Sequence, residues 1–324
     1  MKRPRMTRRS MLIMATACAA TAGSIPSAWS RHEWHGTALG ADGHLIFDGL
    51  DRPTADRMAR LAIAEIDRLE QVFSLYRVDS QLSRLNREGC LEHPSHDLQK
   101  VLGAALGFWR NSKGAFNPAI QPVWRFLAGH FSNPLERGDP DPDKITALLR
   151  LCNPAEIVLD DQKISLKPGM ALTLNGIAQG YITDQVVSLF HSQGLRNILV
   201  QLGEIRALPG RAWDIGIEGS DRTLRLRDGA IASSAGTGTR FTPDTRWHHL
   251  IDPLSGRSGR DFVNVSVQAP TAMMADALST AIAVGNKANA IGVMHNHPHA
   301  AMFAQHADGR AMKIIGRSFP SSFS

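Results

Sequence analysis

The sequence predicts an α+β fold, with one mature domain in which helices pack on a mixed or antiparallel sheet. Amphipathic helical patterns occupy most of the first half, whereas short strand patterns cluster in the second half. Such grouping disfavours the regular alternation of strand and helix that builds a doubly wound sheet. The 324 residues suit one large domain, and no segment repeats at a fixed period.

The clearest helix signal covers residues 54–73, where apolar side chains recur every three or four positions and Arg and Glu occupy the other face. Ser95 is suited to cap a second helix that runs to about Asn111. The Asp-Pro-Asp-Pro-Asp turn at 139–143 opens a short helix through Leu151. This turn could separate two lobes, but its composition favours a surface loop.

The second half of the sequence contains signals for both helices and short strands. A long helix is expected over 177–190, with Gly194 as its stop, and another over 272–284. Short runs bounded by turn residues and partly alternating in polarity predict strands. These runs are 197–202, 213–217, 230–233, 263–268, 300–303 and 312–315.

The positive charge of the chain lies in its first 30 residues. The net charge is +6, yet these residues hold five basic and no acidic side chains, which leaves 31 basic against 30 acidic residues in the remainder. That remainder contains no basic block. We therefore expect no nucleic-acid partner, because binding a phosphate backbone needs clustered Lys and Arg.

The same 30 residues resemble an export signal. A basic stretch ends in the adjacent Arg8 and Arg9, a short apolar run spans 11–23, and small residues frame 28–30. We expect residues 1–30 to be a cleaved signal peptide of twin-arginine type, residues 31–324 to be the mature domain, and the periplasm to be its location. A Sec signal is the alternative, and a lipoprotein is disfavoured because Ala15 occupies the usual Leu position before Cys18.

Two cysteines, Cys90 and Cys152, remain in the mature chain. They do not form a disulfide framework, and the sequence leaves open whether they pair. Neither lies in a Cys-x-x-Cys motif or near a matching His, so a redox or zinc role is not expected.

A small-residue turn at 173–180 could bind phosphate. Asn175, Gly176 and Gly180 permit close approach of backbone to a ligand, and the following helix offers free N–H groups at its N-terminus. The Gly-Lys-Ser/Thr ending of a Walker loop is absent. A closely packed strand-to-helix turn is the structural alternative.

Asp276 and Thr280 could bind a hard cation. They stand four residues apart, on one face of the expected helix, among small Ala residues. A carboxylate and a hydroxyl suit Mg²⁺ or Ca²⁺, although carbonyls, waters or phosphate oxygens must complete the shell. The structural alternative is an Asp at a helix N-terminus and a Thr bonded to its own backbone.

Histidines and tyrosines supply further candidates. His248 and His249 precede an Asp-Pro-x-x-Gly turn, and at most one can face a site because neighbours on a strand point in opposite directions. His295, His297 and His299 alternate in an expected loop without a nearby carboxylate, so metal binding there is disfavoured. Tyr76 and Tyr181 are the only tyrosines and could stack on a ligand or simply pack.

Six segments in order resemble the ApbE family of flavin transferases. The central match is Leu-Asn-Gly-Ile-Ala-Gln-Gly-Tyr at 174–181, and the last is Met-Ala-Asp-Ala-Leu-Ser-Thr at 274–280. The matching segments are 74–86, 114–118, 173–184, 200–208, 249–256 and 274–280. Together they cover nearly the whole mature chain.

The resemblance implies an ApbE-like fold and Mg²⁺-dependent transfer of FMN from FAD to a Thr or Ser hydroxyl of a partner protein, with release of AMP. It implies Asp276, Thr280 and the Gly176 carbonyl region as metal ligands, and Asp276 and His249 as catalytic residues. Tyr76 would lie against the isoalloxazine ring. The implied cofactor-binding residues are Tyr76, Ala115, Phe116, Asn117, Thr173, Gln179 and His249.

Several positions depart from the family pattern. Thr173 and Asn117 replace Asp, Asn175 replaces Gly, Gln179 replaces Lys, Leu39 replaces Met, and the Leu-Gly-Gly-Asn turn reads Leu-Gly-Glu-Ile at 202–205. The sequences at 174–181 and 202–208 resemble those of the NosX-like subgroup. This resemblance implies that the acceptor is a NosR-like membrane flavoprotein with an exported domain.

Two other functions remain open, a periplasmic FAD-binding protein and an Mg²⁺-dependent FAD pyrophosphatase. A flavin oxidoreductase is disfavoured because a Rossmann Gly-x-Gly-x-x-Gly fingerprint is absent.

Overall fold

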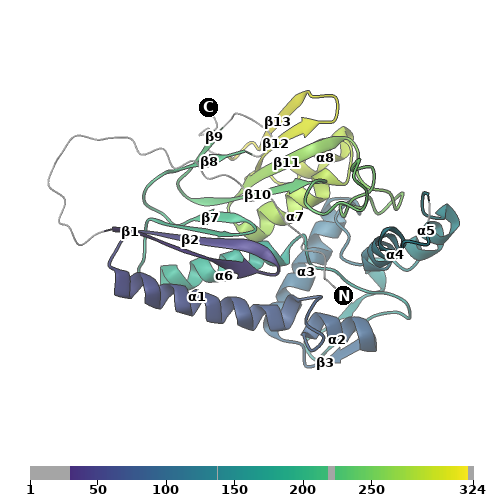
Figure 1. Cartoon of the computed structure of the whole chain (residues 1–324), viewed down its shortest axis with the longest axis horizontal. Coiled ribbons are helices and arrows are strands. Elements are labelled where there is room, and N and C mark those ends of the chain that lie inside the picture. Colours follow the sequence, from purple (N-terminus) through teal and green to yellow (C-terminus); the bar gives the residue numbers. More distant parts are fainter. Residues whose placement is uncertain (1–29, 137, 218–222, 320–324) are drawn as a thin grey trace.

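The computed structural model describes residues 30–136, 138–217 and 223–319. An eight-stranded sheet forms the centre, and every neighbouring pair of its strands is antiparallel (Figure 1). In sheet order the strands are β1 (Ser30–Ala38), β2 (Ala41–Leu50), β6 (Ile198–Leu202), β7 (Ile205–Ala207), β10 (Gly229–Ala235), β11 (Phe262–Ala269), β12 (Ala301–His306) and β13 (Ala311–Ile315). The α+β prediction is confirmed.

Two small sheets accompany the central one. The first has the strand order β3 (Cys90–Glu92), β5 (Lys163–Ser165) and β4 (Val158–Leu159). The second is the hairpin of β8 (Trp213–Gly216) and β9 (Thr223–Leu226). The hairpin lies over the central sheet, since Trp213 and Leu224 share a buried cluster with Ile46 of β2.

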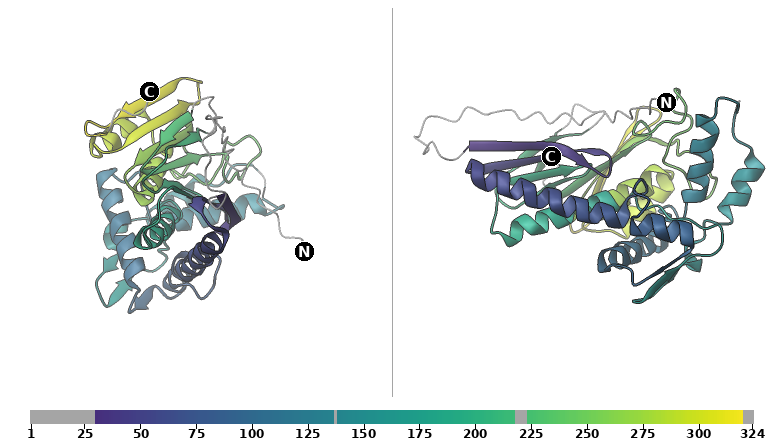
Figure 2. Two further views of the ribbon diagram at one scale, coloured as in Figure 1. Left: turned by 90° about the vertical axis from the view of Figure 1, so that its left-hand side faces the viewer. Right: turned by 60° about the horizontal axis from the view of Figure 1, so that its bottom comes forward.

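Helices cover the opposite face of the central sheet, as two further views show (Figure 2). On β2, Leu45 and Phe47 point into the main helical core, while Ile46 points to the β8–β9 side, as strand alternation requires. The helices are α1 (Arg52–Phe73), α2 (Gln81–Glu88), α3 (His96–Asn111), α4 (Gln121–Ser132), α5 (Pro142–Leu149), α6 (Ala178–Ser192), α7 (Ala272–Ala283) and α8 (Lys287–His295). Among the described residues, no helix combines the length and hydropathy that crossing a bilayer requires.

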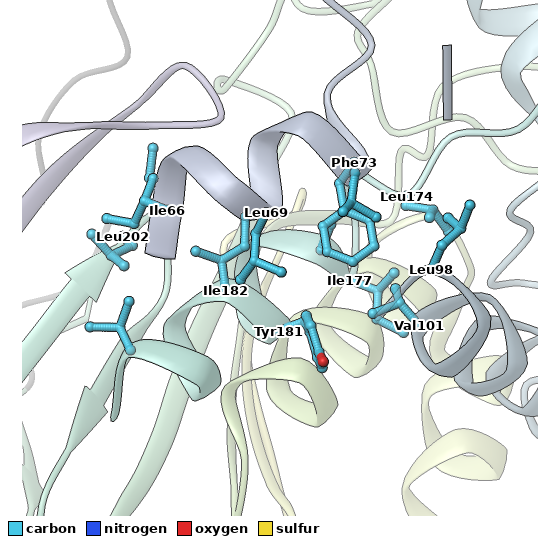
Figure 3. Packing of buried hydrophobic residues seen from close by; sticks show 14 of the residues in the cluster. Ile66, Leu69, Phe73, Leu98, Val101, Leu174, Ile177, Tyr181, Ile182 and Leu202 are labelled. Atoms are coloured by element: carbon cyan, nitrogen blue, oxygen red, sulfur yellow. The ribbon is translucent and has the colours of Figure 1, made fainter. Parts of the chain in front are cut away.

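The main core joins α1, α3 and α6. Figure 3 shows Leu69 and Phe73 of α1 packed over Ile182 and Ile177, with Leu98 and Val101 of α3 beside them. Burial of apolar surface contributes roughly 25 cal/mol per Å², so this three-helix contact is a major source of stability. It also fixes the start of α6 relative to the end of α1.

Helix ends follow the expected capping chemistry. Ser95 caps α3 by accepting a hydrogen bond from the Leu98 amide, as its sequence position predicts, and Asp51 caps α1 in the same way. The 139–143 turn opens α5 through Asp141, which accepts from the Asp143 amide. This helix ends at Leu149, two residues before the predicted Leu151.

Several elements were missing from the sequence prediction. They are the β1–β2 hairpin, the strands β3, β4, β5, β7 and β9, and the helices α2, α4 and α8. The predicted loop around His295, His297 and His299 is wrong at its start, because His295 closes α8. In α8 only Ala290, Val293 and Met294 are buried, which is too little apolar surface to give a clear periodic signal.

Cys90 and Cys152 are free thiols. Cys152 is buried beside α4, and burial raises the pKa of its thiol to about 11. Such a thiol remains protonated and unreactive at neutral pH. The predicted signal peptide falls on residues 1–30, of which 1–29 lie outside the described residues.

Candidate functional site

The turn at 173–180 and helix α7 lie directly against each other. Gly180 packs so close to the first turn of α7 that a Cβ there would overlap the carbonyl group of Ala272. The amide N of Gly180 donates a hydrogen bond of 3.1 Å to Oδ2 of Asp276. Glycine at this position therefore permits the contact, and the contact holds the buried Asp276 carboxylate at the start of α6.

Thr280 lies one helical turn beyond Asp276 and faces the same turn. A Cβ on Gly176 would stand 2.8 Å from Oγ1 of Thr280, so the backbone of Gly176 and the threonine hydroxyl meet without an intervening side chain. The structure thus brings together the three residues predicted as metal ligands, which the sequence separates by about 100 positions.

The donor set of these residues fits a magnesium ion. A carboxylate, a hydroxyl and backbone carbonyls are all hard oxygen donors, which Mg²⁺ prefers. Mg²⁺ demands six ligands and usually keeps substrate phosphates or waters among them. The side chains of Asp276 and Thr280 supply only two of these ligands, so carbonyls, waters or phosphate oxygens would have to complete the shell.

A second wall of the site comes from residues 115–118. The Thr173 amide donates to the carbonyl of Pro118 at 2.8 Å, which ties this segment to the glycine turn. The Asn117 side chain is already engaged at both ends, since its Nδ2 donates to the Cys152 carbonyl and its Oδ1 accepts from the Ala119 amide. Asn117 therefore shapes the wall, and any direct bond to a ligand must be shared with these contacts.

Phe116 and Ala115 differ in their exposure. The Phe116 ring is 3% exposed and packs in the main core, 6.1 Å from the ring of Phe108. Ala115 is half-buried. Of these two predicted cofactor-binding residues, Phe116 packs in the core beneath the site, and Ala115 can face a ligand.

Gln179 is buried in the first turn of α6, beside the turn between β6 and β7. Gly203 in that turn has φ +93°, and a Cβ there would lie 2.8 Å from Nε2 of Gln179. Among the described residues this Nε2 has no hydrogen-bond partner. A buried donor left unsatisfied costs about 1–3 kcal/mol, so the amide is available to a ligand acceptor.

His248 and His249 make different contacts, but they do not lie in a strand as the sequence predicts, since His248 forms only an isolated β-bridge with Arg240. His248 is buried, and one of its ring nitrogens, Nε2, lies 2.9 Å from the carbonyl of Gly259. Burial lowers the pKa of His248, and the nearby charge of Arg260 lowers it further, so this ring is neutral at pH 7. His249 is half-buried and contacts the 236–239 loop through the backbone of Thr239.

The 236–239 loop links His249 to α7. It leaves the end of β10, where the Ser234 hydroxyl forms a 2.8 Å hydrogen bond with the Ser279 hydroxyl of α7. Three residues after the end of β10, Gly238 lies against the His249 ring, since a Cβ there would stand 3.2 Å from Cε1. The loop that contacts His249 therefore follows a strand that is anchored to α7 one residue before Thr280.

Tyr76 lies on the loop after α1 and is 72% exposed. Its backbone is held by the Ser74 hydroxyl, which accepts from the amides of Tyr76 and Arg77. Phe73, three residues earlier, packs beside Leu174 of the glycine turn (Figure 3). An exposed aromatic ring on a fixed backbone beside that turn is free to stack on a planar ligand.

Tyr181 has a structural role. Its ring packs edge-on against Phe73, and its hydroxyl donates to Asp97 at 2.6 Å. Burial and the Asp97 carboxylate raise the pKa of this phenol. Of the two tyrosines considered as stacking residues, Tyr76 alone remains available.

The sequence prediction missed Asp184, which fixes the position of α7. Its two carboxylate oxygens accept from the amides of Ala272 and Met273 at 2.8 and 3.0 Å, and Arg206 of β7 pairs with it. A negative charge at a helix N-terminus is favourable. An acidic residue within the apolar run 177–190 was the available signal, because a buried carboxylate requires partners.

Comparisons with known proteins agree with this geometry. A model of the ApbE family matches residues 39–303. The FAD:protein FMN transferase of Treponema pallidum is 30% identical over 264 residues, 71% of this chain and 72% of that protein. The enzyme of the same name from Haemophilus influenzae is 29% identical over 286 residues, 80% of this chain and 82% of that protein.

Solved structures share the fold. The ApbE protein from Thermotoga maritima superposes with a TM-score of 0.76 and 23% identity, covering 88% of this chain and 97% of that one. The apo flavinyl transferase ApbE of Pseudomonas stutzeri gives a TM-score of 0.77 with 22% identity, covering 90% and 97%. At this identity the likeness speaks for the fold alone.

The fold and site define a class of α+β domain in which two helices meet at a glycine turn beside an acidic residue and a threonine. Within that class, the chain belongs to the ApbE family, whose model spans more than half of it. The curated relatives that it matches are flavin transferases.

Proposed function

We propose that this protein is an FAD:protein FMN transferase that uses Mg²⁺, with FAD and an acceptor protein as its substrates. The single observation that carries the proposal is the junction of α6 and α7. There the Gly180 amide holds Asp276, and Thr280 meets the Gly176 backbone, in a chain that belongs to the ApbE family.

In the proposed reaction, the oxygen of a Thr or Ser hydroxyl on the acceptor attacks the FMN phosphorus of FAD. The phosphoanhydride bond breaks, AMP leaves, and the hydroxyl proton passes to a base or to water. Asp276, Thr280 and the Gly176 carbonyl would hold a magnesium ion, which would neutralise charge on the pyrophosphate and the leaving group. The transfer then depends mostly on positioning.

Different residues of the protein position different parts of FAD. The glycine turn lets backbone come close to the pyrophosphate, although the amides of Ile177 and Ala178 already donate to the Leu174 carbonyl and that of Gly180 donates to Asp276. Gln179 offers an unpartnered amide donor, and Ala115 and Thr173 form the neighbouring wall. Tyr76 covers the isoalloxazine ring.

The test separates three products. The purified chain is incubated with FAD, Mg²⁺ and an exported acceptor domain, and the products are resolved by mass spectrometry. A transferase yields FMN bound to the acceptor with AMP in equal amount. Free FMN plus AMP would mean a pyrophosphatase, and intact FAD would mean a flavin-binding protein. Either of these two results refutes the proposed transfer.

His249 provides a first prediction. We propose that His249 contacts FAD or removes the proton from the acceptor hydroxyl, since its ring is half-buried against the loop that follows the strand anchored beside Thr280, whereas His248 is buried and bonded to Gly259. His249→Ala is therefore expected to lower the transfer rate by roughly 100-fold or more, the usual value of general-base help. The measurement is single-turnover transfer beside thermal stability.

His248→Ala is the matched control. It removes a buried ring that packs against Gly236 and is expected to lower the melting temperature more than His249→Ala does. A His249→Ala enzyme with the wild-type rate would remove this residue from the mechanism.

We propose further that the chain acts in the periplasm after twin-arginine export, on a domain of a membrane flavoprotein. The basic stretch that ends in Arg8 and Arg9 supports the route, and the sequence versions at 174–181 and 202–208 support a NosX-like subgroup with a NosR-like acceptor. Genomic neighbours that encode such an acceptor are the most direct check of the partner.

Export gives a second prediction. Changing both Arg8 and Arg9 to Lys is expected to strand the precursor in the cytoplasm, because the twin-arginine route requires the arginine pair. The control changes Arg3 and Arg5 to Lys and keeps the same charge. Cell fractionation is the measurement, and normal periplasmic accumulation of the Arg8/Arg9 variant would favour the Sec route instead.

A further inference from the structure

A second cluster of potential metal ligands lies on the β1–β2 hairpin, outside the proposed flavin site. His35 on β1 stands directly opposite His44 on β2 in the antiparallel register. Glu33 lies two residues before His35, so all three side chains emerge on one face of the sheet. Directly opposed residues have Cβ atoms about 4.5–5.5 Å apart, which places both imidazoles within reach of one ligand.

The donor atoms of this cluster converge. The two imidazole rings stack with centroids 4.1 Å apart and an angle of 15° between their planes. Nε2 of His44 is 3.0 Å from Oε2 of Glu33, and Nε2 of His35 is 3.7 Å from the same oxygen. One donor atom from each of the three residues lies within 4.8 Å of the other two.

We propose that Glu33, His35 and His44 form a binding site for a divalent transition metal of the Zn²⁺, Ni²⁺ and Cu²⁺ class. Two imidazoles and one carboxylate are ligands that these borderline ions favour, whereas Mg²⁺ prefers an all-oxygen shell. The site therefore differs in chemistry from the oxygen donors around Asp276. Three protein ligands leave at least one coordination position open for water or another ligand.

Arg31 orients the carboxylate of this site. Its Nε is 2.7 Å from Oε1 of Glu33, while Oε2 faces the two imidazoles. Partners of this kind fix the direction of a ligating group, and their loss typically lowers metal affinity 10- to 100-fold. The guanidinium charge opposes the cation, so the same contact also limits the affinity.

The cluster is separated from the flavin site by the sheet itself. His44 and Ile46 lie on the same face of β2, and Ile46 packs with Trp213 and Leu224 of the β8–β9 hairpin. Leu45 and Phe47 point through the other face toward α1 and α6, the helical side on which α7 also packs. Occupation of the cluster thus need not disturb FMN transfer.

A bound ion would join β1 to β2. β1 is the edge strand of the eight-stranded sheet and pairs with β2 alone. Edge strands lack a partner on one side, and a ligand that binds only the folded hairpin stabilises it by mass action. We infer a stabilising role for the metal at this edge.

The test uses the full chain, purified without a polyhistidine tag, with Mg²⁺ in excess so that oxygen-donor sites are filled. Titration with Zn²⁺ in a calorimeter is expected to show one site per chain. His35→Ala and Glu33→Gln should each weaken Zn²⁺ binding at least about 10-fold. His35 is well exposed, with 69% of its side-chain surface accessible, so its loss should leave the fold intact.

His295→Ala and His299→Ala are matched controls, because they remove histidines from another part of the chain and should leave the affinity unchanged. Electron paramagnetic resonance of bound Cu²⁺ adds a direct signature, with couplings to two imidazole nitrogens in the wild type and one in His35→Ala. Equal Zn²⁺ affinity of wild type and His35→Ala would overturn the site. So would an equal loss of affinity in the two controls.

Discussion

Asp276→Asn is expected to lower FMN transfer on the order of 1000-fold while the chain remains folded. The change removes the one carboxylate of the proposed metal site, and a metal ion supplies several kcal/mol of charge stabilisation in the transition state. The remaining carboxamide oxygen can still accept the hydrogen bond from the Gly180 amide. Transfer rates measured across a range of Mg²⁺ concentrations, beside thermal unfolding, check the prediction.

Two companion variants sharpen this test. Asp276→Ala removes both the charge and the acceptor for Gly180, so it should lose activity as Asp276→Asn does and also lose stability. Thr280→Val removes one neutral ligand and is expected to lower the rate about fivefold, since a single hydrogen-bond-sized interaction is worth about 1 kcal/mol. Full activity of Asp276→Asn at low Mg²⁺ would show that the ion, if used, binds elsewhere.

Asp184→Ala is expected to lower the free energy of unfolding by about 3–5 kcal/mol, the usual effect of breaking a buried ion pair. The carboxylate accepts from two amides at the start of α7 and pairs with Arg206, and Asp184 is only 8% exposed. Its removal leaves a half-buried guanidinium and two helix N–H groups without this partner. Urea denaturation followed by circular dichroism gives the free energy directly.

The same variant should also reduce activity, because α7 carries both Asp276 and Thr280. Asp184→Asn is the control, since its carboxamide oxygen can still accept from one helix amide. We expect Asp184→Asn to lie between wild type and Asp184→Ala in stability. An Asp184→Ala chain with wild-type stability would mean that Thr271, the N-cap of α7, is sufficient to hold the helix start.

Much of the fold follows from local sequence patterns. The apolar spacing in 54–73 predicts α1, Ser95 marks the start of α3, and five of the six predicted strands match observed strands within two residues at each end. These features depend on side-chain periodicity and capping, which act over one or two helical turns. The β1–β2 hairpin gave no such pattern, because histidine, charged and half-buried residues fill its first strand.

The sequence motifs predicted only part of the candidate site. The resemblance of the motifs to the ApbE family identified Gly176, Asp276 and Thr280, and the family comparison confirmed that membership. The motifs carried no information on Asp184, whose partners are backbone amides 88 residues and more away. They also assigned Phe116 to the cofactor, whereas the structure places its ring in the core.

The sequence by itself determined the α+β class, the main helices and the family of this protein, because these follow from local periodicity and from ordered motifs. Only the tertiary structure decided how those motifs meet. The distance between Asp276 and the glycine turn is set by Gly180 packing on Ala272, and the pairing of His35 with His44 is set by strand register. Contacts of this kind join residues far apart in the chain, and they arise from steric fit and hydrogen bonding that no local pattern specifies.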